Sequence, residues 1–234
     1  MQRRNFLALA TVPAIAVVDS AFAAESRQSR YEQDLAALAA SRSKLSKRHR
    51  AAKTAAKKHA VLERAEQRLL EAFDDALFPA WRGTPWDYNG TSTVPGTGTI
   101  ACGYFVTTLL SHAGFRVERA KLAQQASERI VKALSGPASI WRFRKGDESG
   151  VVDAIQKEGN GLYVVGLDNH VGFLRVGANQ RFWHSSYLEP AVVTGEDPKK
   201  AAAFESNYHV VGKLFTPRLL ERWLAAEAIE TPSS

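Results

Sequence analysis

The sequence predicts an α+β protein in which a long basic helical extension precedes a domain built on an antiparallel sheet. Three observations lead to this fold class. The chain from Glu25 to Phe78 contains no Gly or Pro and is rich in strong helix formers. Shorter helical patterns follow between residues 101 and 157, and apolar strand-like runs separated by turn residues begin at Leu162. Helices that come first and strands that follow indicate α+β rather than alternating α/β architecture.

Residues 1–23 have the pattern of an export signal and are not expected to be part of the fold. Arg3 and Arg4 precede an apolar run over residues 7–18, and a small-x-small cleavage pattern ends at Ala23. Paired arginines at this position are typical of twin-arginine export signals in bacteria. The run is shorter than the roughly 20 apolar residues of a membrane span. We therefore expect a periplasmic or secreted protein, with no transmembrane segment in the mature chain.

Residues 24–77 are predicted to form the long helical segment. Residues such as Ala55, Leu62, Leu69 and Ala76 recur at seven-residue spacing, but many positions of this pattern are alanine. The partial heptad leaves two arrangements open, a coiled coil and a helical hairpin. The C-terminal part of the segment is apolar enough to dock on the domain that follows.

The middle of this segment is strongly basic. Residues 42–58 contain eight Lys or Arg and no Asp or Glu, within a chain whose formal net charge is +7. Such a run is either a solvated helical face or a contact surface for an anionic polymer or membrane. In the expected compartment nucleic acid is not a partner. The run therefore points to anionic cell wall or membrane headgroups.

Residues 78–234 are predicted to form the folded domain. A turn-rich stretch over residues 79–100 comes first, and Gly, Pro and turn pairs then separate the helices and strands. Gly114 closes the first of these helices, and Gly136 with Pro137 ends the second. We expect helices over residues 101–113, 118–134, 151–157 and 217–229, a short strand or turn over 140–143, and strands over 162–167, 170–176, 180–186 and 208–216.

Cys102 is the only cysteine in the chain and is predicted to lie in the first turn of the helix over residues 101–113. Unpaired backbone N–H groups and the helix dipole at that end favour a thiolate, so we expect a lowered thiol pKa. The same N–H groups can stabilise the oxyanion that forms when a carbonyl is attacked. A single cysteine cannot form an internal disulfide. The alternative interpretation of Cys102 is a buried, inert thiol.

Two histidines follow Cys102 in strand-like settings. His170 is placed to take a proton from the thiol, and His184, 14 residues later on the neighbouring strand, is placed to orient the His170 ring. Other roles stay open: a metal site with Asp168, or histidines that are satisfied core residues. His209 is a further candidate for the orienting role. We favour imidazole chemistry, and we expect no metal and no cofactor.

Four segments together resemble the NlpC type of papain-like cysteine peptidases, whose members are mostly bacterial cell-wall hydrolases. The segments are GTPWDYNG from residue 83, ACGYFV from residue 101, HVGF from residue 170 and FWHSS from residue 182. The resemblance implies a papain-like fold over about residues 78–215, with a catalytic helix packed on the antiparallel sheet. It also implies that Cys102 is the nucleophile, His170 the base and His184 the orienting residue.

The resemblance further implies three substrate-binding positions. Trp86 stands where the family often has an active-site Tyr, and Tyr88 is close enough in sequence to supply that hydroxyl. Gly103 replaces the usual Ser and Ala101 the usual Asp, at positions that help to recognise substrate in the family. These departures indicate a divergent subgroup with its own substrate.

The expected function is that of an exported cysteine peptidase or amidase that cleaves an amide bond in peptidoglycan stem peptides through Cys102. Two alternatives stay open. The first keeps the fold and changes the chemistry, to an amidase or acyltransferase that acts on another substrate. The second is a non-catalytic cell-wall-binding protein that uses the basic segment as a tether.

Overall fold

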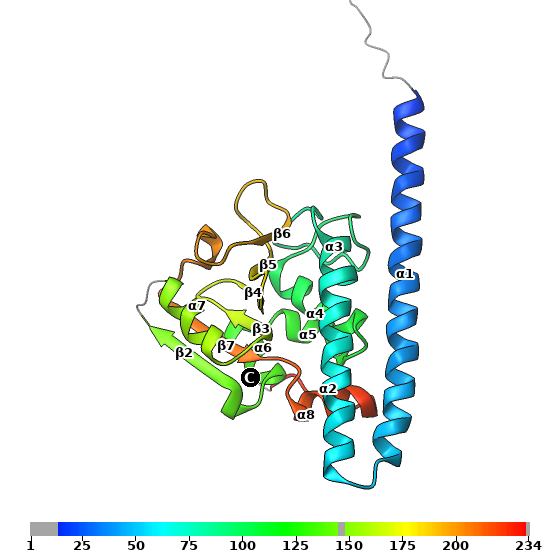
Figure 1. The fold of residues 1–234 in the computed structure, drawn as a ribbon. Helices are drawn as coiled ribbons and strands as arrows, with labels where there is room; N and C mark the ends of the chain where they lie inside the picture. Colours follow the sequence, from blue (N-terminus) through cyan, green and yellow to red (C-terminus); the bar gives the residue numbers. More distant parts are fainter. Residues whose placement is uncertain (1–13, 145–147, 233–234) are drawn as a thin grey trace, which may run out of the picture.

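The computed structural model describes residues 14–144 and 148–232, and its fold is mixed α+β, as the sequence predicts (Figure 1). An antiparallel sheet carries helices on both faces, and a long helical hairpin stands along one side. The predicted export signal lies mostly outside the described residues, and from Ala14 onward its backbone belongs to the first helix. Within the described part of the chain, no helix combines the length and the apolar character that a membrane crossing needs.

The predicted long helical segment is a hairpin of two helices, α1 (Ala14–Ala51) and α2 (Ala55–Ala72). Thr54 caps α2, because its hydroxyl accepts a hydrogen bond from a backbone N–H of the first turn (3.3 Å). α2 continues through a π-helical turn (Phe73–Leu77) into the short helix α3 (Phe78–Trp81). Of the two arrangements that the heptad pattern leaves open, the chain adopts the hairpin.

The hairpin shares the main hydrophobic core of the protein. Leu38 and Leu45 of α1 are buried, as are Ala65 and Leu69 of α2. These side chains belong to the same contiguous cluster as helix α4 (Cys102–His112) and the central strands. Because apolar side chains from both helices are removed from water there, the hairpin is docked on the rest of the fold.

Within the described residues the main sheet has six strands, and every neighbouring pair is antiparallel. In spatial order the strands are β2 (Ile140–Arg144), β7 (Tyr208–Lys213), β3 (Gly161–Gly166), β4 (Val171–Val176), β5 (Arg181–Ser185) and β6 (Val193–Glu196).

Side chains of the central strand β3 alternate between two cores. Leu162 and Val164 belong to the main core with α4, whereas Tyr163 and Val165 belong to a second core on the opposite face. Helix α7 (Glu148–Lys157) covers that second face. The sheet is therefore buried on both sides, which explains why its central strands consist of nearly continuous apolar runs.

The predicted helix over residues 118–134 is divided into α5 (Arg119–Ala123) and α6 (Ser127–Leu134). The backbone is extended at Ala126 (ψ 144°), and this ends the helical path without a Gly or Pro to signal it. α6 then packs on β3 and contributes its apolar side chains to the main core.

The C-terminal helix α8 (Pro217–Ala225) is shorter than the predicted helix over residues 217–229. Ala226 adopts a left-handed conformation (φ 57°) that ends the helix. The next residues form β8 (Ala228–Ile229), which pairs in parallel with β1 (Arg116–Val117). The sequence analysis does not predict β1, β6 or β8, because all three are too short to show an alternating pattern.

Replacement of Leu69 by Ala is expected to lower the free energy of unfolding by about 2–5 kcal/mol, because Leu69 is fully buried where the hairpin meets the main core. Leu70 is only partly buried, so Leu70→Ala is a control with the same change in helix propensity and a smaller expected loss. Urea denaturation followed by circular dichroism measures both variants. Equal losses would contradict docking of the hairpin through Leu69.

Candidate active site

Cys102 is the first residue of α4, and a hydrogen bond between the preceding residues and strand β5 holds the start of this helix in place. Ala101 before it has an extended backbone (φ −80°, ψ 160°) and provides no side-chain cap, so the N–H groups at the start of α4 are left for other partners. The carbonyl oxygen of Ile100 accepts a hydrogen bond from the Ser185 hydroxyl (2.6 Å). This bond ties the start of α4 to β5, the strand that carries His184.

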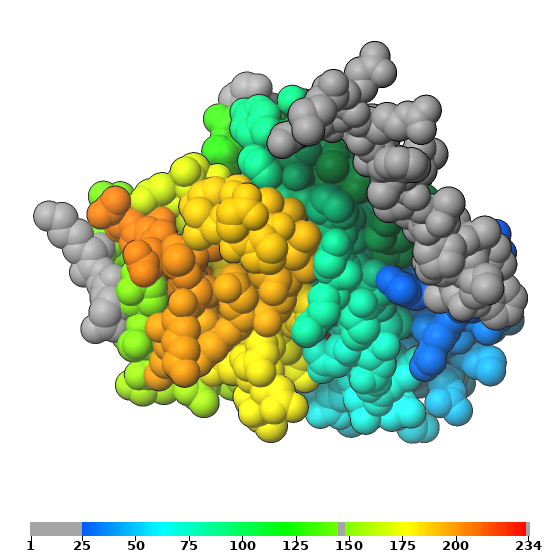
Figure 2. Space-filling view, turned by 90° about the horizontal axis from the view of Figure 1, so that it is seen from above, coloured from blue at the N-terminus to red at the C-terminus, as the bar shows by residue number. Residues whose placement is uncertain are grey.

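The turn-rich segment over residues 79–100 is held against the loop that follows β5. The backbone N–H of Gly83 donates to the Val193 carbonyl oxygen, and that of Trp86 donates to the Ala191 carbonyl oxygen, both at 2.8 Å. In Figure 2 the two segments lie side by side, in teal and gold. This pairing places the Trp86 side chain next to the start of α4.

His170 and His184, which the sequence places on neighbouring strands, are in direct contact. His170 lies just before β4, and His184 lies within β5. The Nε2 atom of His170 is 2.9 Å from the Nδ1 atom of His184. Both residues are buried, with exposed fractions of 2% and 0%. A hydrogen bond between two buried rings therefore orients the imidazole of His170.

Glu196, the last residue of β6, extends this pair to three side chains. Its Oε2 atom lies 2.7 Å from the Nε2 atom of His184. This hydrogen bond holds the pKa of the Glu196 carboxyl below its usual range. Glu196 is not predicted from the sequence because its short strand, β6, is not predicted either. The β-branched run of Val192, Val193 and Thr194 is the signal that could have found the strand.

Five of the six site residues that the sequence singles out line one cavity of about 700 Å³. They are Cys102, Gly103, His170, Trp86 and Tyr88. Tyr88 lies at the rim, since 81% of its surface is exposed. The sixth residue, His184, is not part of the lining and contacts the cavity only through the ring of His170.

Gly103 is required for the close approach of α4 to the end of α5. A Cβ atom at this position would clash with the carbonyl oxygen of Ala123. Gly103 and Ala123 are both part of the cavity wall. The absence of a side chain therefore determines the shape of the cavity directly beside Cys102.

Tyr187 is a cavity residue that the sequence analysis does not single out. Its ring lies 5.3 Å from the His170 ring, at an interplanar angle of 73°, and 6.3 Å from the Trp86 ring. Tyr187 follows the strand of His184 by two residues, and that proximity in sequence is the signal that could have found it. It adds an aromatic wall next to the candidate base.

The described residues that line this cavity include no Asp, Glu, Lys or Arg. Besides the aromatic rings, the wall presents amide side chains, including those of Gln124 and Gln125. A smaller cavity of about 350 Å³ adjoins the first at Cys102, and its lining includes Asp168 and Glu128, which is ion-paired with Lys132 and Arg142. The thiol therefore lies where the two cavities meet.

The Cys102 thiol and the His170 ring are both neutral near pH 7. Burial raises the pKa of the Cys102 thiol, and this effect exceeds the opposing effect of the backbone N–H groups of Val171, Gly103 and Cys102. Burial, with a smaller contribution from His184, lowers the pKa of His170 to about 3. The expectation of a lowered thiol pKa is therefore wrong, because loss of solvent outweighs the helix N-terminus.

The alternative candidates from the sequence have structural partners. His209 is buried on β7, and its Nε2 atom lies 2.9 Å from the Phe204 carbonyl oxygen. Asp168 accepts a hydrogen bond from the backbone N–H of Asn207 (2.9 Å). In the part of the chain that the structure describes, no three His, Cys, Asp or Glu side chains are grouped as a metal site would require.

Alkylation of Cys102 by iodoacetamide is expected to be slow at pH 6 and to accelerate only above the ordinary thiol pKa of about 8.5. The reason is that burial raises the thiol pKa, so the reactive thiolate forms only at alkaline pH. The measurement is the rate of alkylation against pH, with a small-molecule thiol in parallel. A fast reaction at pH 6 that His170→Ala slows would contradict a neutral resting pair.

Comparisons of the chain with protein-family models, with curated proteins and with solved structures find no match. The fold brings three groups together: the Cys102 thiol and the hydrogen-bonded rings of His170 and His184. The thiol and the His170 ring line the same cavity.

Proposed function

We propose that this protein is an exported cysteine hydrolase of papain-like type that cleaves an amide bond in peptidoglycan stem peptides. One observation carries the proposal: the only thiol of the chain begins a helix and shares a cavity with a buried histidine that a second histidine orients. A nucleophile, a base and a group that orients the base are the components of a thiol hydrolase. The cavity is within the size range of small-ligand sites.

In the proposed reaction, His170 takes the proton of the Cys102 thiol while the sulfur attacks the substrate carbonyl carbon. Backbone N–H groups at the start of α4 stabilise the oxyanion. His170 then gives the proton to the leaving amine, and the C–N bond breaks to leave a thioester on Cys102. Water, which loses a proton to the same ring, hydrolyses the thioester and restores the thiol. Because both groups start neutral, the proton moves during the attack.

The arrangement of elements supports the papain-like part of the proposal. The helix that begins with Cys102 packs on β4 and β5, next to the two histidines. This is the arrangement that the resemblance to NlpC-type peptidases implies. Trp86 and Tyr88, which the resemblance assigns to substrate binding, lie on the wall of the cavity.

The cavity lining supports a peptide substrate that binds through uncharged groups on one side of the bond. Burying an unpaired charge costs free energy, and the described lining offers no charged side chain to pair with it. Gln124 and Gln125 can donate to and accept from peptide groups. On the other side, Glu128 is already ion-paired with Lys132 and Arg142, so the adjoining cavity gives no argument for a charged substrate group. An amidase or acyltransferase acting on another substrate would use the same components.

The variants Cys102→Ala and His170→Ala are each expected to lower the release of peptides from cell-wall fragments by at least about 10³-fold, because they remove the nucleophile and the base. His59→Ala is the matched control, since His59 lies exposed on α2 and its loss should leave turnover unchanged. Mass spectrometry of the products measures release, and an added amine acceptor distinguishes hydrolysis from acyl transfer. Full activity in Cys102→Ala would end the proposal.

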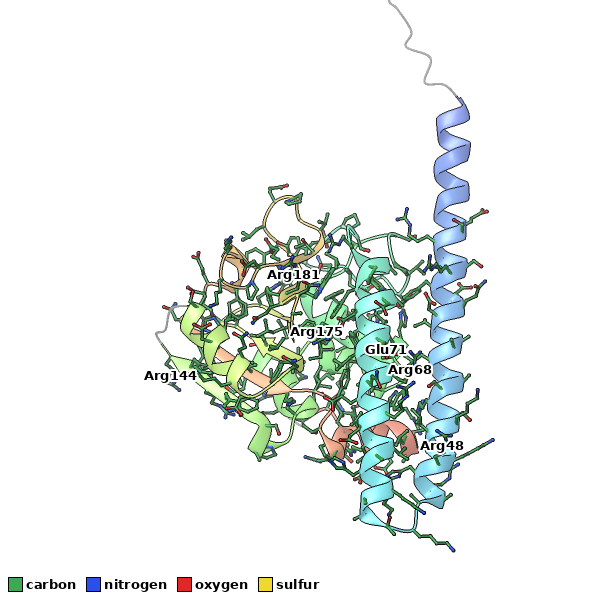
Figure 3. The ribbon with its side chains drawn as sticks, in the orientation of Figure 1. Arg48, Arg68, Glu71, Arg144, Arg175 and Arg181 are labelled. Atoms are coloured by element: carbon green, nitrogen blue, oxygen red, sulfur yellow. The ribbon has the colours of Figure 1, made fainter. Side chains whose placement is uncertain are left out.

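A second candidate function, binding to an anionic surface, is favoured by a groove between the two helices of the hairpin. We call this feature the basic groove. It measures about 590 Å³ and is lined by five cationic side chains and, among the described residues, by no Asp or Glu. Figure 3 shows Arg48 and Arg68 on the two helices. The five cations are Lys44, Lys47 and Arg48 of α1 and Arg64 and Arg68 of α2.

The cations that line the basic groove are not the same set as the cations of residues 42–58. Arg42 is bound to the fold, because its Nε donates to the Trp223 carbonyl oxygen (2.6 Å) and its guanidinium lies over the Trp223 ring. Arg64 and Arg68, from outside residues 42–58, join the groove, where Arg68 is also ion-paired with Glu71. A cationic groove suits the phosphate groups of an anionic membrane or of a wall polymer.

Changing Lys44, Lys47 and Arg48 together to Gln is expected to weaken binding to phosphatidylglycerol vesicles or to purified cell wall by about 10- to 100-fold, because three cations are lost. Binding of the wild type should fall as salt is raised. The control changes Lys157, Lys199 and Lys200 to Gln, which removes the same charge from exposed positions away from the groove.

Co-sedimentation with vesicles and, separately, with wall material measures binding and identifies which surface is the partner. Equal loss in the two triple variants, or binding that salt does not weaken, would contradict the basic groove as the contact. Binding by a Cys102→Ala protein, with no turnover by the wild type, would instead favour a non-catalytic cell-wall-binding protein.

A further inference from the structure

We propose that Glu196 is a positioning residue that selects which ring nitrogen carries the proton in His184 and, through it, in His170. This proposal rests on the proposed function, because it concerns the base of the same site. Glu196 does not line the cavity of Cys102. It acts on the reaction only through two consecutive hydrogen bonds, one between its carboxylate and His184 and one between His184 and His170.

The first step is the hydrogen bond between Glu196 and His184 (2.7 Å). An ionised carboxylate can only accept hydrogen bonds, and this bond itself favours the ionised form by lowering the carboxyl pKa. The proton in the bond therefore belongs to the Nε2 atom of His184. The Glu196 side chain is 39% exposed, so water can solvate its other lone pairs and keep the charge at the sheet edge.

The second step is the hydrogen bond between the two rings (2.9 Å). When Nε2 of a neutral His184 ring carries the proton, its Nδ1 atom has a lone pair and can only accept. The proton between the rings then belongs to the Nε2 atom of His170. Burial keeps His170 neutral, so its Nδ1 atom is left without a proton. Nδ1 is therefore the nitrogen that can receive the thiol proton.

Packing holds the central ring in place. Phe182 stacks on the His184 ring, with centroids 4.5 Å apart and an interplanar angle of 18°. The His170 ring stands nearly perpendicular to that of His184, at 88°. Gly172 leaves space for this arrangement, since a Cβ atom there would clash with His184 and Phe182. The rings therefore have little freedom to turn, so the Nε2 atom of His170 stays opposite the Nδ1 atom of His184.

A neutral amide at position 196 would no longer fix which atom donates in the two hydrogen bonds. Glutamine can turn either its carbonyl oxygen or its NH₂ group toward Nε2 of His184. In the second case the His184 proton moves to Nδ1, and the bond between the rings reverses. His170 then carries its proton on Nδ1 and cannot accept one from the thiol. Part of the Glu196→Gln protein would hold this inactive pair of tautomers.

Nitrogen-15 NMR of the histidine-labelled protein reads the protonated ring nitrogen directly and needs no substrate. In the wild type at neutral pH, we expect protons on Nε2 alone in both His170 and His184. In Glu196→Gln we expect a mixture of tautomers. The control is Glu205→Gln, which neutralises an exposed carboxylate on the loop before β7 and should leave both rings unchanged.

Turnover gives the second readout. Glu196→Gln is expected to lower kcat by about 10- to 100-fold with little change in KM, because an outer partner of a functional histidine is lost while the cavity lining is intact. A proton on Nδ1 of His170 in the wild type would overturn the proposal, as would unchanged tautomers and kcat in Glu196→Gln. If the Glu196→Gln variant does not fold, the ring nitrogens that carry protons in the wild type decide whether the proposal holds. A wild type with these tautomers and no hydrolysis would count only against the proposed function.

Discussion

The candidate site depends on the antiparallel register of β4, β5 and β6. His184 pairs with Thr194 across β5 and β6, and this register brings the His184 ring between His170 and Glu196. Side chains alternate along a strand, so a shift of one residue would turn His184 to the opposite face of the sheet. Gly172 on β4 keeps the space that the ring occupies. The three polar side chains, which are far apart in sequence, thus meet because of strand pairing.

The distribution of charge across these side chains follows their burial. The thiol is partly buried and the first ring is fully buried, and in both the loss of solvent favours the neutral form. The carboxylate lies at the partly exposed edge of the sheet, where hydration keeps it ionised at little cost. The His184 ring connects these two environments. The fold therefore connects a negative charge to the candidate base through His184 without placing that charge in the cavity.

Patterns that depend on neighbouring residues could be predicted from the sequence, and properties that depend on tertiary burial could not. The apolar runs around Tyr163 and Phe173 identify the central strands, and Gly114 marks the end of α4. The break near Ala126 has no residue that signals it, because it arises where α6 turns onto the sheet. Glu196 could not be predicted because its strand, β6, is too short to show an alternating pattern. The expected direction of the thiol pKa shift was wrong, because the sequence shows the N-terminus of a helix but does not show the loss of solvent around Cys102.

The hairpin is connected to the same helix that carries the thiol. α4 begins with Cys102 and ends with His112, and the Nδ1 atom of His112 lies 2.8 Å from the Tyr31 hydroxyl of α1. Trp81 donates a hydrogen bond to the same hydroxyl (3.0 Å). Because a partly buried hydrogen bond and a shared core join α1 to α4, the basic groove and the cavity belong to one packed unit. If the basic groove binds an anionic surface as proposed, the cavity would therefore have a fixed orientation relative to that surface.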